Sequence, residues 1–230
     1  MKSLIIIPVL ALVLGSCTMY DLDIKKTTQS NPPTTTQISP GSVSLEIKQT
    51  LLDAYSEEVL AHDIYTKMVE KYPNLTEVKN IINSEANHRE QVGRLLDTRN
   101  ITRPTGYGIY SGTYDVLKKM LDSSLTGAIE AGVMIETGDI DHLLSEYKKV
   151  EDQDVRMIFE NIGGGSFNHL RAFLRLAGQE KYTVTTEYSR YMKSDEINSN
   201  GPLQSKMTEL LKANNLPTYG GLTMGMGNGQ

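Results

Sequence analysis

Tryptophan is absent from this sequence, phenylalanine occurs only three times, and alternating β-branched residues are rare. Because sandwiches and barrels are built from strands rich in such residues, this shortage argues against an all-β fold. The single cysteine, Cys17, excludes a disulfide within the chain, so stability must come from packing or from metal binding. The net charge of -5 offers no basic surface, and we do not expect nucleic-acid binding.

Long apolar runs are also scarce, and the one at the start of the chain is short. In MKSLIIIPVLALVLGSC, Lys2 precedes an apolar run from Leu4 to Leu14. Such a run is too short to span a bilayer as a stable helix and is typical of a signal-peptide core. The LGSC at its end resembles the lipobox of bacterial lipoproteins, so we expect residues 1–16 to be a lipoprotein signal peptide and Cys17 to be lipidated. An ordinary secretory signal that contains a cysteine is the alternative.

These features predict an exported protein that a lipid anchors to the cell membrane or outer membrane, facing the periplasm or the exterior. Residues 17–43 are rich in Thr, Pro and Ser and lack apolar periodicity, which predicts an extended tether. At the other end, residues 217–230 are rich in Gly and Met, and we expect a disordered tail.

The 230-residue chain is long enough for one domain with extensions, and the apolar residues between its two ends recur at helical spacing. The pattern predicts four long helices, with Thr76 as the N-cap of the second, at about residues 44–71, 76–97, 125–150 and 152–176. We therefore expect an all-α four-helix bundle with short extra helices. Its domain would cover residues 44–198, including an aromatic-rich wrap, and a short C-terminal helix would follow within residues 199–216.

Each long helix carries a metal-competent side chain near the middle of its apolar stripe. In chain order these are Glu58, then Glu85 with His88, then Glu136 with Asp139, and His169. Buried charges need partners, and carboxylates gathered without a cation repel one another. Because residues three apart share one helix face, Glu85 and His88 can both reach one site. The pattern predicts a metal site in the core of the bundle.

Each of these residues also has a simpler interpretation when it is taken alone. Glu85 and His88 would form a solvated pair on the surface, and His169 would be a hydrogen-bonded core histidine. Glu58 would pair with a nearby Lys or Arg. The interruption of all four helices at mid-length favours a shared site over three unrelated explanations.

The segments SEEVLAHDIY, SEANHREQV, GVMIETGDIDHL and ENIGGGSFNHLRAFLR resemble those of a ferritin-like family, a domain of unknown function. The resemblance extends over about residues 45–197. It implies a ferritin-like bundle, from a superfamily that commonly holds two iron or manganese ions and has oxidase, peroxidase-like or iron-handling chemistry. It makes Tyr65 a candidate catalytic residue. It also implies metal ligands at Glu58, Glu85, His88, Glu136 and His169.

The sequence departs from the pattern of this family at one position. The resemblance implies a glutamate three residues before His169, and that position holds Ser166. Glu160 is no substitute on an ideal helix, because nine residues at about 100° each place it opposite His169. We expect Asp139, one turn after Glu136, to supply the missing carboxylate as a sixth ligand. Alternatively, the run of three glycines before Ser166 distorts the helix.

Two functions remain open from the sequence. The first is a membrane-tethered metal protein with one or two iron or manganese ions, either a di-metal oxidoreductase or an iron-handling protein. The second is a non-catalytic surface lipoprotein, with zinc or a degenerate metal site, whose loops or tail bind a protein partner. Ser166 favours the second function, because an expected ligand is missing there. The complete set of expected ligands on the other three helices favours the first. The sequence identifies no substrate.

Overall fold

A computed structural model describes residues 44–219, and every regular element in this range is helical, which confirms the expected all-α fold. The long helices are α1 (Leu45–Lys71), α2 (Thr76–Thr98), α4 (Leu125–Lys149) and α5 (Gln153–Gln179). The short ones are η1 (Gly108–Tyr110), α3 (Ser111–Ser123), α6 (Ser194–Ile197) and α7 (Ser205–Ala213). The predicted signal peptide, Cys17, the tether and residues 220–230 of the predicted tail lie outside the described residues. Within residues 44–219, no helix has the length and apolar character needed to cross a bilayer.

Three of the long helices begin at side-chain caps that fix where each helix starts. Ser44, Ser124 and Asp152 each accept a hydrogen bond from a backbone N–H in the first turn of α1, α4 and α5. The predicted cap of α2 is wrong. Thr76 is the first helical residue, and its hydroxyl donates to the side chain of Glu77, while Leu75 precedes it without a side-chain cap.

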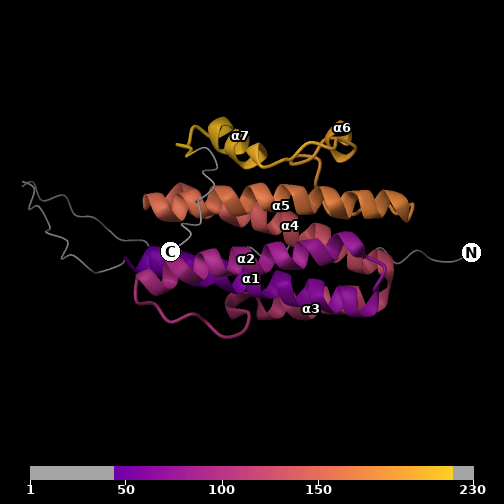
Figure 1. Ribbon diagram of the computed structural model, residues 1–230, viewed down its shortest axis with the longest axis horizontal. Coiled ribbons are helices and arrows are strands. Elements are labelled where there is room, and N and C mark those ends of the chain that lie inside the picture. The colour runs from indigo at the N-terminus through magenta and orange to yellow at the C-terminus, as the bar shows by residue number, and fades with distance from the viewer. Residues whose placement is uncertain (1–43, 220–230) are drawn as a thin grey trace, which may run out of the picture. The chain divides into compact units, whose positions relative to one another are not determined.

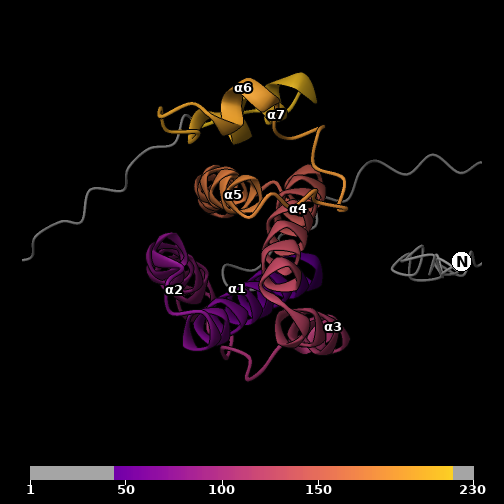
Figure 2. The ribbon, with the colours of Figure 1, turned by 90° about the vertical axis from the view of Figure 1, so that its right-hand side faces the viewer.

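The four long helices pack side by side around one core (Figures 1 and 2). α1 lies against α2 and α4, and α5 lies against the same two helices from the other side. Short links make α1 antiparallel to α2 and α4 antiparallel to α5. α1 and α4 are also antiparallel, because Thr50 hydrogen-bonds Glu146 near one end while Tyr65 hydrogen-bonds Glu136 further along. α2 and α4 therefore run in the same direction at diagonal positions.

One long connection, residues 99–124, joins these diagonal helices. Within it, η1 contacts α1, and α3 packs against both α1 and α4 (Figure 2). The chain thus crosses α1 on the outside and returns along the length of the bundle before α4 begins. This crossing allows α2 and α4 to be parallel.

The chain after α5 folds back over the outside of that helix, where α6 and α7 lie (Figure 2). Glu130 of α4 anchors the first part of this segment, because it accepts hydrogen bonds from the backbone and hydroxyl groups of Thr185 and Thr186 and from the Tyr182 hydroxyl. At the far end, residues 217–219 of the predicted tail contact α4 and α5 through the Pro217 carbonyl and the Tyr219 N–H.

The three consecutive glycines of α5 do not interrupt it, since the helix is continuous from Gln153 to Gln179. Instead they allow close packing on two sides. A Cβ atom at Gly163 or Gly164 would lie within 3 Å of the Met207 or Gln204 side chain, both on the α7 side. A Cβ atom at Gly165 would lie 2.6 Å from the ring of His88. The distortion considered from the sequence is absent from α5.

Candidate metal centre

The fold brings all six predicted ligands into its core. Every one of them is buried, from Glu58 and Glu136 at 2% exposed to His169 at 7%. Each of the four long helices contributes at least one of these side chains. The six side chains therefore lie in the core where the apolar stripes of the four helices meet.

Glu85 lies between the two histidines. Its Oε2 atom is 3.1 Å from Nδ1 of His88, and its Oε1 atom is 2.8 Å from Nδ1 of His169. The two imidazole rings are roughly parallel, with centroids 5.6 Å apart. One carboxylate thus offers one oxygen to each side of the centre, which is the arrangement of a bridging ligand.

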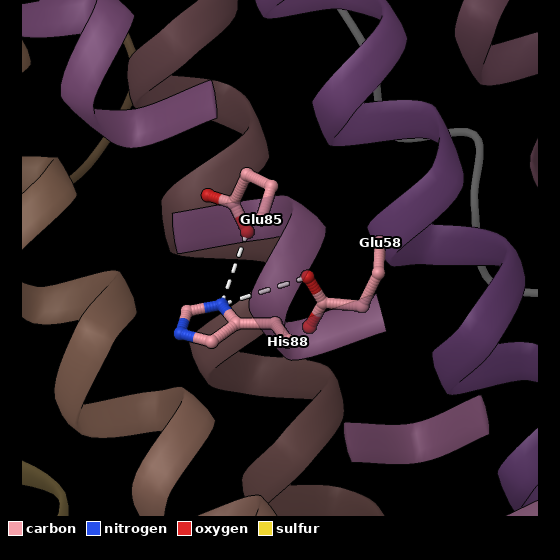
Figure 3. A group of neighbouring side chains, drawn as sticks. All are labelled: Glu58, Glu85 and His88. Atoms are coloured by element: carbon pink, nitrogen blue, oxygen red, sulfur yellow. Dashed lines mark hydrogen bonds and ion pairs between the residues drawn. The ribbon is translucent and has the colours of Figure 1, made fainter. Parts of the chain in front are cut away.

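A further carboxylate lies beside each histidine. Oε2 of Glu58 is 3.6 Å from Nδ1 of His88, and Figure 3 shows Glu58 and Glu85 approaching the same nitrogen of that ring. On the other side, Oε2 of Glu136 is 3.5 Å from Nδ1 of His169. Two groups result, one with His88 and one with His169, and Glu85 belongs to both. Within each group the ligand atoms lie within 4.8 Å of one another.

Tyr65 and Ser166 contact carboxylates of this centre. The Tyr65 hydroxyl donates to Oε1 of Glu136 at 2.5 Å, which leaves Oε2 of Glu136 on the side of His169. The Ser166 hydroxyl donates to Oδ2 of Asp139, also at 2.5 Å. Ser166 therefore orients a carboxylate from α4 at the position where the resemblance implies a glutamate on α5.

Sequence reasoning missed Glu57, which is 6% exposed and forms a third group with Glu58 and Asp139. A signal for it was available. Buried residues of α1 recur at intervals of four and three, and Glu57 occupies the open position in the series Thr50, Ala54, Ala61, Ile64, Met68. Glu58 occupies the corresponding position in a second, adjacent stripe. Both carboxyls consequently point into the core.

Other polar residues considered from the sequence lie elsewhere. Glu160 is buried but accepts hydrogen bonds from Thr208 and from the Tyr219 N–H, so it stays outside the centre as expected. In the described part of the chain Glu58 has no ion pair with a Lys or Arg, and its basic neighbour is His88. The other two of the four histidines, His62 and His142, are half-buried and belong to none of the three groups.

Burial raises the pKa of three carboxyls of the centre. It raises the pKa of Glu57 and of Glu58 well above the ordinary value, and the neighbouring carboxylates raise both further. Burial also raises the pKa of Glu136 to about 7, although His169 acts in the opposite direction. The core therefore favours the protonated form of these three carboxyls more than solvent would.

The two histidines and Glu85 shift in the opposite sense. Burial by itself would lower the pKa of His169, but Glu85 and Glu136 raise it to about 10. Burial likewise opposes the charged form of His88, whose pKa Glu85 nevertheless raises. The pKa of Glu85 would rise on burial, but His169 and His88 lower it below its usual range. The two histidines therefore favour the ionised form of Glu85, and Glu85 favours the protonated form of each histidine.

Two atoms of the centre have no hydrogen-bond partner among the described residues, and both belong to predicted ligands. They are Oε2 of Glu58 and Nδ1 of His169, each fully buried. Nδ1 of His169 is close to Glu85, but the angles do not make a hydrogen bond. Unpaired buried donors and acceptors are costly, whereas a divalent cation would engage both atoms. The mixed set of imidazole nitrogens and carboxylate oxygens fits iron, manganese or zinc.

Comparison with known proteins gives the family of this chain. Residues 47–200 match the family described as an uncharacterized protein domain, DUF2202. The chain is also similar to the uncharacterized protein MJ0754 of Methanocaldococcus jannaschii, with 32% identity over 163 residues, 67% of this chain and 88% of that protein. The crystal structure of that hypothetical protein superimposes with a TM-score of 0.61 at 29% identity, covering 74% of this chain and 95% of the other. The chain belongs to the DUF2202 family.

Proposed function

We propose that this protein is a membrane-tethered, ferritin-like metal protein whose core binds two iron or manganese ions. The observation that carries the proposal is Glu85, which presents one carboxylate oxygen to each of two buried histidines. If Glu85 only formed an ion pair, one histidine beside it would suffice. Two metal ions that share the Glu85 carboxylate would instead each take one of the two histidines as a ligand.

Two further observations support a ferritin-like bundle. Ferritin-like folds have one long crossover between their second and third bundle helices. Residues 99–124 make such a connection here, over α1 and along α3. The segments that resemble a ferritin-like family also carry the side chains that meet at the centre.

The residues divide into two half-sites. His88 and Glu58 would hold one ion, His169 and Glu136 the other, and Glu85 both. When bound, iron or manganese with open coordination positions supplies the chemistry of oxidation by dioxygen or peroxide. The chain itself excludes bulk water by burying all five ligands.

Tyr65 keeps Glu136 oriented through its hydrogen bond. Tyr65 is the candidate catalytic residue, because its hydroxyl contacts a ligand directly.

The location outside the cytoplasm rests on the sequence. The short apolar run of residues 4–14 ends at an LGSC motif, and the Thr- and Pro-rich residues after Cys17 are suited to a tether. We propose a lipid anchor at Cys17 on these grounds.

One observation favours a second candidate, a non-catalytic surface lipoprotein with a structural zinc or a degenerate site. Ser166 stands where a carboxylate ligand is implied, and its hydroxyl is engaged by Asp139. With a ligand missing on the α5 side, one half-site would be incomplete, and a single zinc held in the other as a closed structural site would do no chemistry.

Metal loading of full-length protein in detergent tests the proposal. After anaerobic incubation with Fe²⁺ or Mn²⁺ and removal of free metal, we expect about two equivalents by elemental analysis. Less than about half an equivalent of either metal contradicts it. Retention of zinc in preference to both metals, with no spectral change when the loaded protein meets dioxygen, supports the second candidate.

A matched pair of variants locates the metal. Glu85→Gln keeps the shape of the side chain but removes the charge shared by both half-sites, so both ions should be lost. Glu70→Gln makes the same change at an exposed position of α1 without an ion pair among the described residues, and its metal content should equal that of the wild type. Equal metal content in the two variants would show that Glu85 is not a ligand.

A further inference from the structure

Beside the two half-sites, the third group of carboxyls lies between α1 and α4. It consists of Glu57, Glu58 and Asp139, with one oxygen of each within 4.8 Å of the others. Glu57 and Asp139 are each 6% exposed. The group contains no histidine, so neither half-site accounts for Glu57 or Asp139.

Glu57 has no hydrogen-bond donor in the described part of the chain other than another carboxyl group. No backbone N–H, hydroxyl or basic side chain there donates to it, and its polar neighbour is Asp139. A carboxyl that is 94% buried without a donor is costly for an apolar core. Glu58 contributes an oxygen, Oε2, that is buried without a hydrogen-bond partner among the described residues and lies 3.6 Å from Nδ1 of His88. No lysine or arginine among the described residues forms an ion pair with Glu57 or Glu58, so a divalent cation would supply positive charge to both.

The Asp139 carboxylate accepts a hydrogen bond from a hydroxyl group and has no basic side chain as a partner among the described residues. The Ser166 donor fixes its Oδ2 atom and leaves Oδ1 available. The three carboxyls thus offer an oxygen-only site, which suits hard divalent cations such as Mn²⁺, Fe²⁺ and Mg²⁺ and binds them less tightly than a site with imidazoles.

A row of polar side chains continues from this group along the contact between α1 and α4. Asp53 and Thr50 lie one and two turns before Glu57 on α1. His142 and Glu146 lie one and two turns after Asp139 on α4. The Thr50 hydroxyl donates to Glu146 at 2.6 Å, which brings the two rows together.

Glu57 and Asp139 are buried, whereas Asp53, His142 and Glu146 are only half-buried. The row therefore extends from the core to the surface. Tyr110 of η1 lies over it, with its hydroxyl 3.3 Å from Nδ1 of His142. Burial raises the pKa of Tyr110, and the charges of Glu57 and Asp139 raise it further, which agrees with this position. The row is the polar connection between the surface and Glu58.

We propose that Glu57, Glu58 and Asp139 form a third divalent-cation position, where an incoming ion is held before it reaches the half-site of Glu58 and His88. The inference rests on the proposed function, since it needs a metal centre to supply. Glu58 belongs to both groups and transfers the ion. Asp53 and Glu146 give this row negative charge near the surface, where Lys149 pairs with Glu146 at 2.6 Å, and a negative outer end favours the entry of cations over anions.

Mn²⁺ binding to full-length protein in detergent tests this assignment. At millimolar Mn²⁺ the wild type and the Glu70→Gln control should bind about three equivalents, and Glu57→Gln and Asp139→Asn about two. In stopped-flow loading, the rate at which the two tight positions fill should fall by about ten-fold in Glu57→Gln and Asp139→Asn and stay unchanged in the control. Both variants keep the size of a buried acid and remove only its ability to ionise, so their metal-free forms should melt no lower than the wild type.

Loss of the third equivalent together with slower loading supports the proposal. Wild-type stoichiometry and wild-type loading rate in both variants overturn it and leave the two-ion centre intact. No Mn²⁺ bound by the wild type overturns both this inference and the proposed function. If one variant does not fold, the other decides the result.

Discussion

At the residue scale, Ser166 is the position where the candidate centre differs from the pattern of the ferritin-like family that the sequence resembles. Its side chain is 1% exposed, and its hydroxyl donates to Asp139 while also lying 3.0 Å from the carbonyl oxygen of Ile162 one turn earlier. α5 lacks this carboxylate, while α4 and α1 contribute two others, Asp139 and Glu57. The centre therefore holds one acidic group more than the resemblance implies, in a different arrangement.

This arrangement predicts that two substitutions of Ser166 both destabilise the metal-free protein, by different amounts. Ser166→Glu adds a buried carboxyl against Asp139 and should lower the free energy of unfolding of the metal-free protein by on the order of 3 kcal/mol. Ser166→Ala removes one hydrogen bond to a charged group and should cost about 1.5 kcal/mol. Denaturant unfolding of metal-free protein measures both. A Ser166→Glu variant as stable as the wild type would mean that there is room for a glutamate at this position.

At the element scale, α5 connects the centre to the outer layer of the fold. Its three glycines bring α7 close on one side and admit the His88 ring on the other. Asn168 and Arg171 of the same helix hold the chain after α6, since Asn168 accepts from the Leu203 N–H and Arg171 donates to the Gly201 carbonyl. They thus anchor the outer layer, and neither contacts the metal ligands.

The contact between Gly165 and His88 leads to a prediction about metal binding. In Gly165→Ala the new methyl group would lie 2.6 Å from the imidazole, so His88 must move and metal content should fall toward one equivalent. Gly138→Ala is the matched control, because nothing lies within 4 Å of a Cβ atom at that exposed position of α4. This control should bind metal normally and gain about 0.5–1 kcal/mol from the higher helix propensity of alanine.

Elemental analysis and thermal melting of the two variants measure these effects. Normal metal content in Gly165→Ala would show that His88 is not a ligand, since the displaced ring could no longer bind the metal. Loss of metal in Gly138→Ala would indicate a general sensitivity of the bundle to glycine substitution.

At the scale of the whole molecule, stability depends on pH through the buried centre. In the metal-free protein the pKa of Glu136 is raised from 4.5 to about 7 and that of His169 from 6.5 to about 10. For both groups the folded state binds more protons than the unfolded state between these values, so stability falls as pH rises through them. Glu85 acts oppositely, because its lowered pKa makes its contribution disappear as pH falls below 4.5.

We therefore expect the melting temperature of metal-free protein to fall between about pH 5 and pH 9. Metal should reverse this trend, because its ligands must lose their protons before they bind, and affinity then rises with pH. The difference in melting temperature between Mn²⁺-loaded and metal-free protein should increase over the same range. Calorimetry at a series of pH values measures it, and a constant difference would argue against binding at these titrating groups.

The sequence by itself determined the four long helices and the six core residues first assigned to the metal centre. Both follow from a local property, since apolar residues at helical spacing define a buried stripe, and a carboxylate or imidazole within that stripe must be buried too. Glu85 and His88 share a helix face through their spacing alone. Even Glu57 could have been found in this way, from the second stripe of α1.

Only the tertiary structure decided which of these side chains meet. The place of Glu85 between His88 and His169 depends on α2 lying beside α5, and the hydrogen bond from Ser166 to Asp139 depends on α5 lying beside α4. Helical periodicity shows which face of a helix is buried but not which neighbour covers it. That choice is made by the crossover over α1, which places α2 and α4 diagonally and brings the side chains of four separate helices to one point.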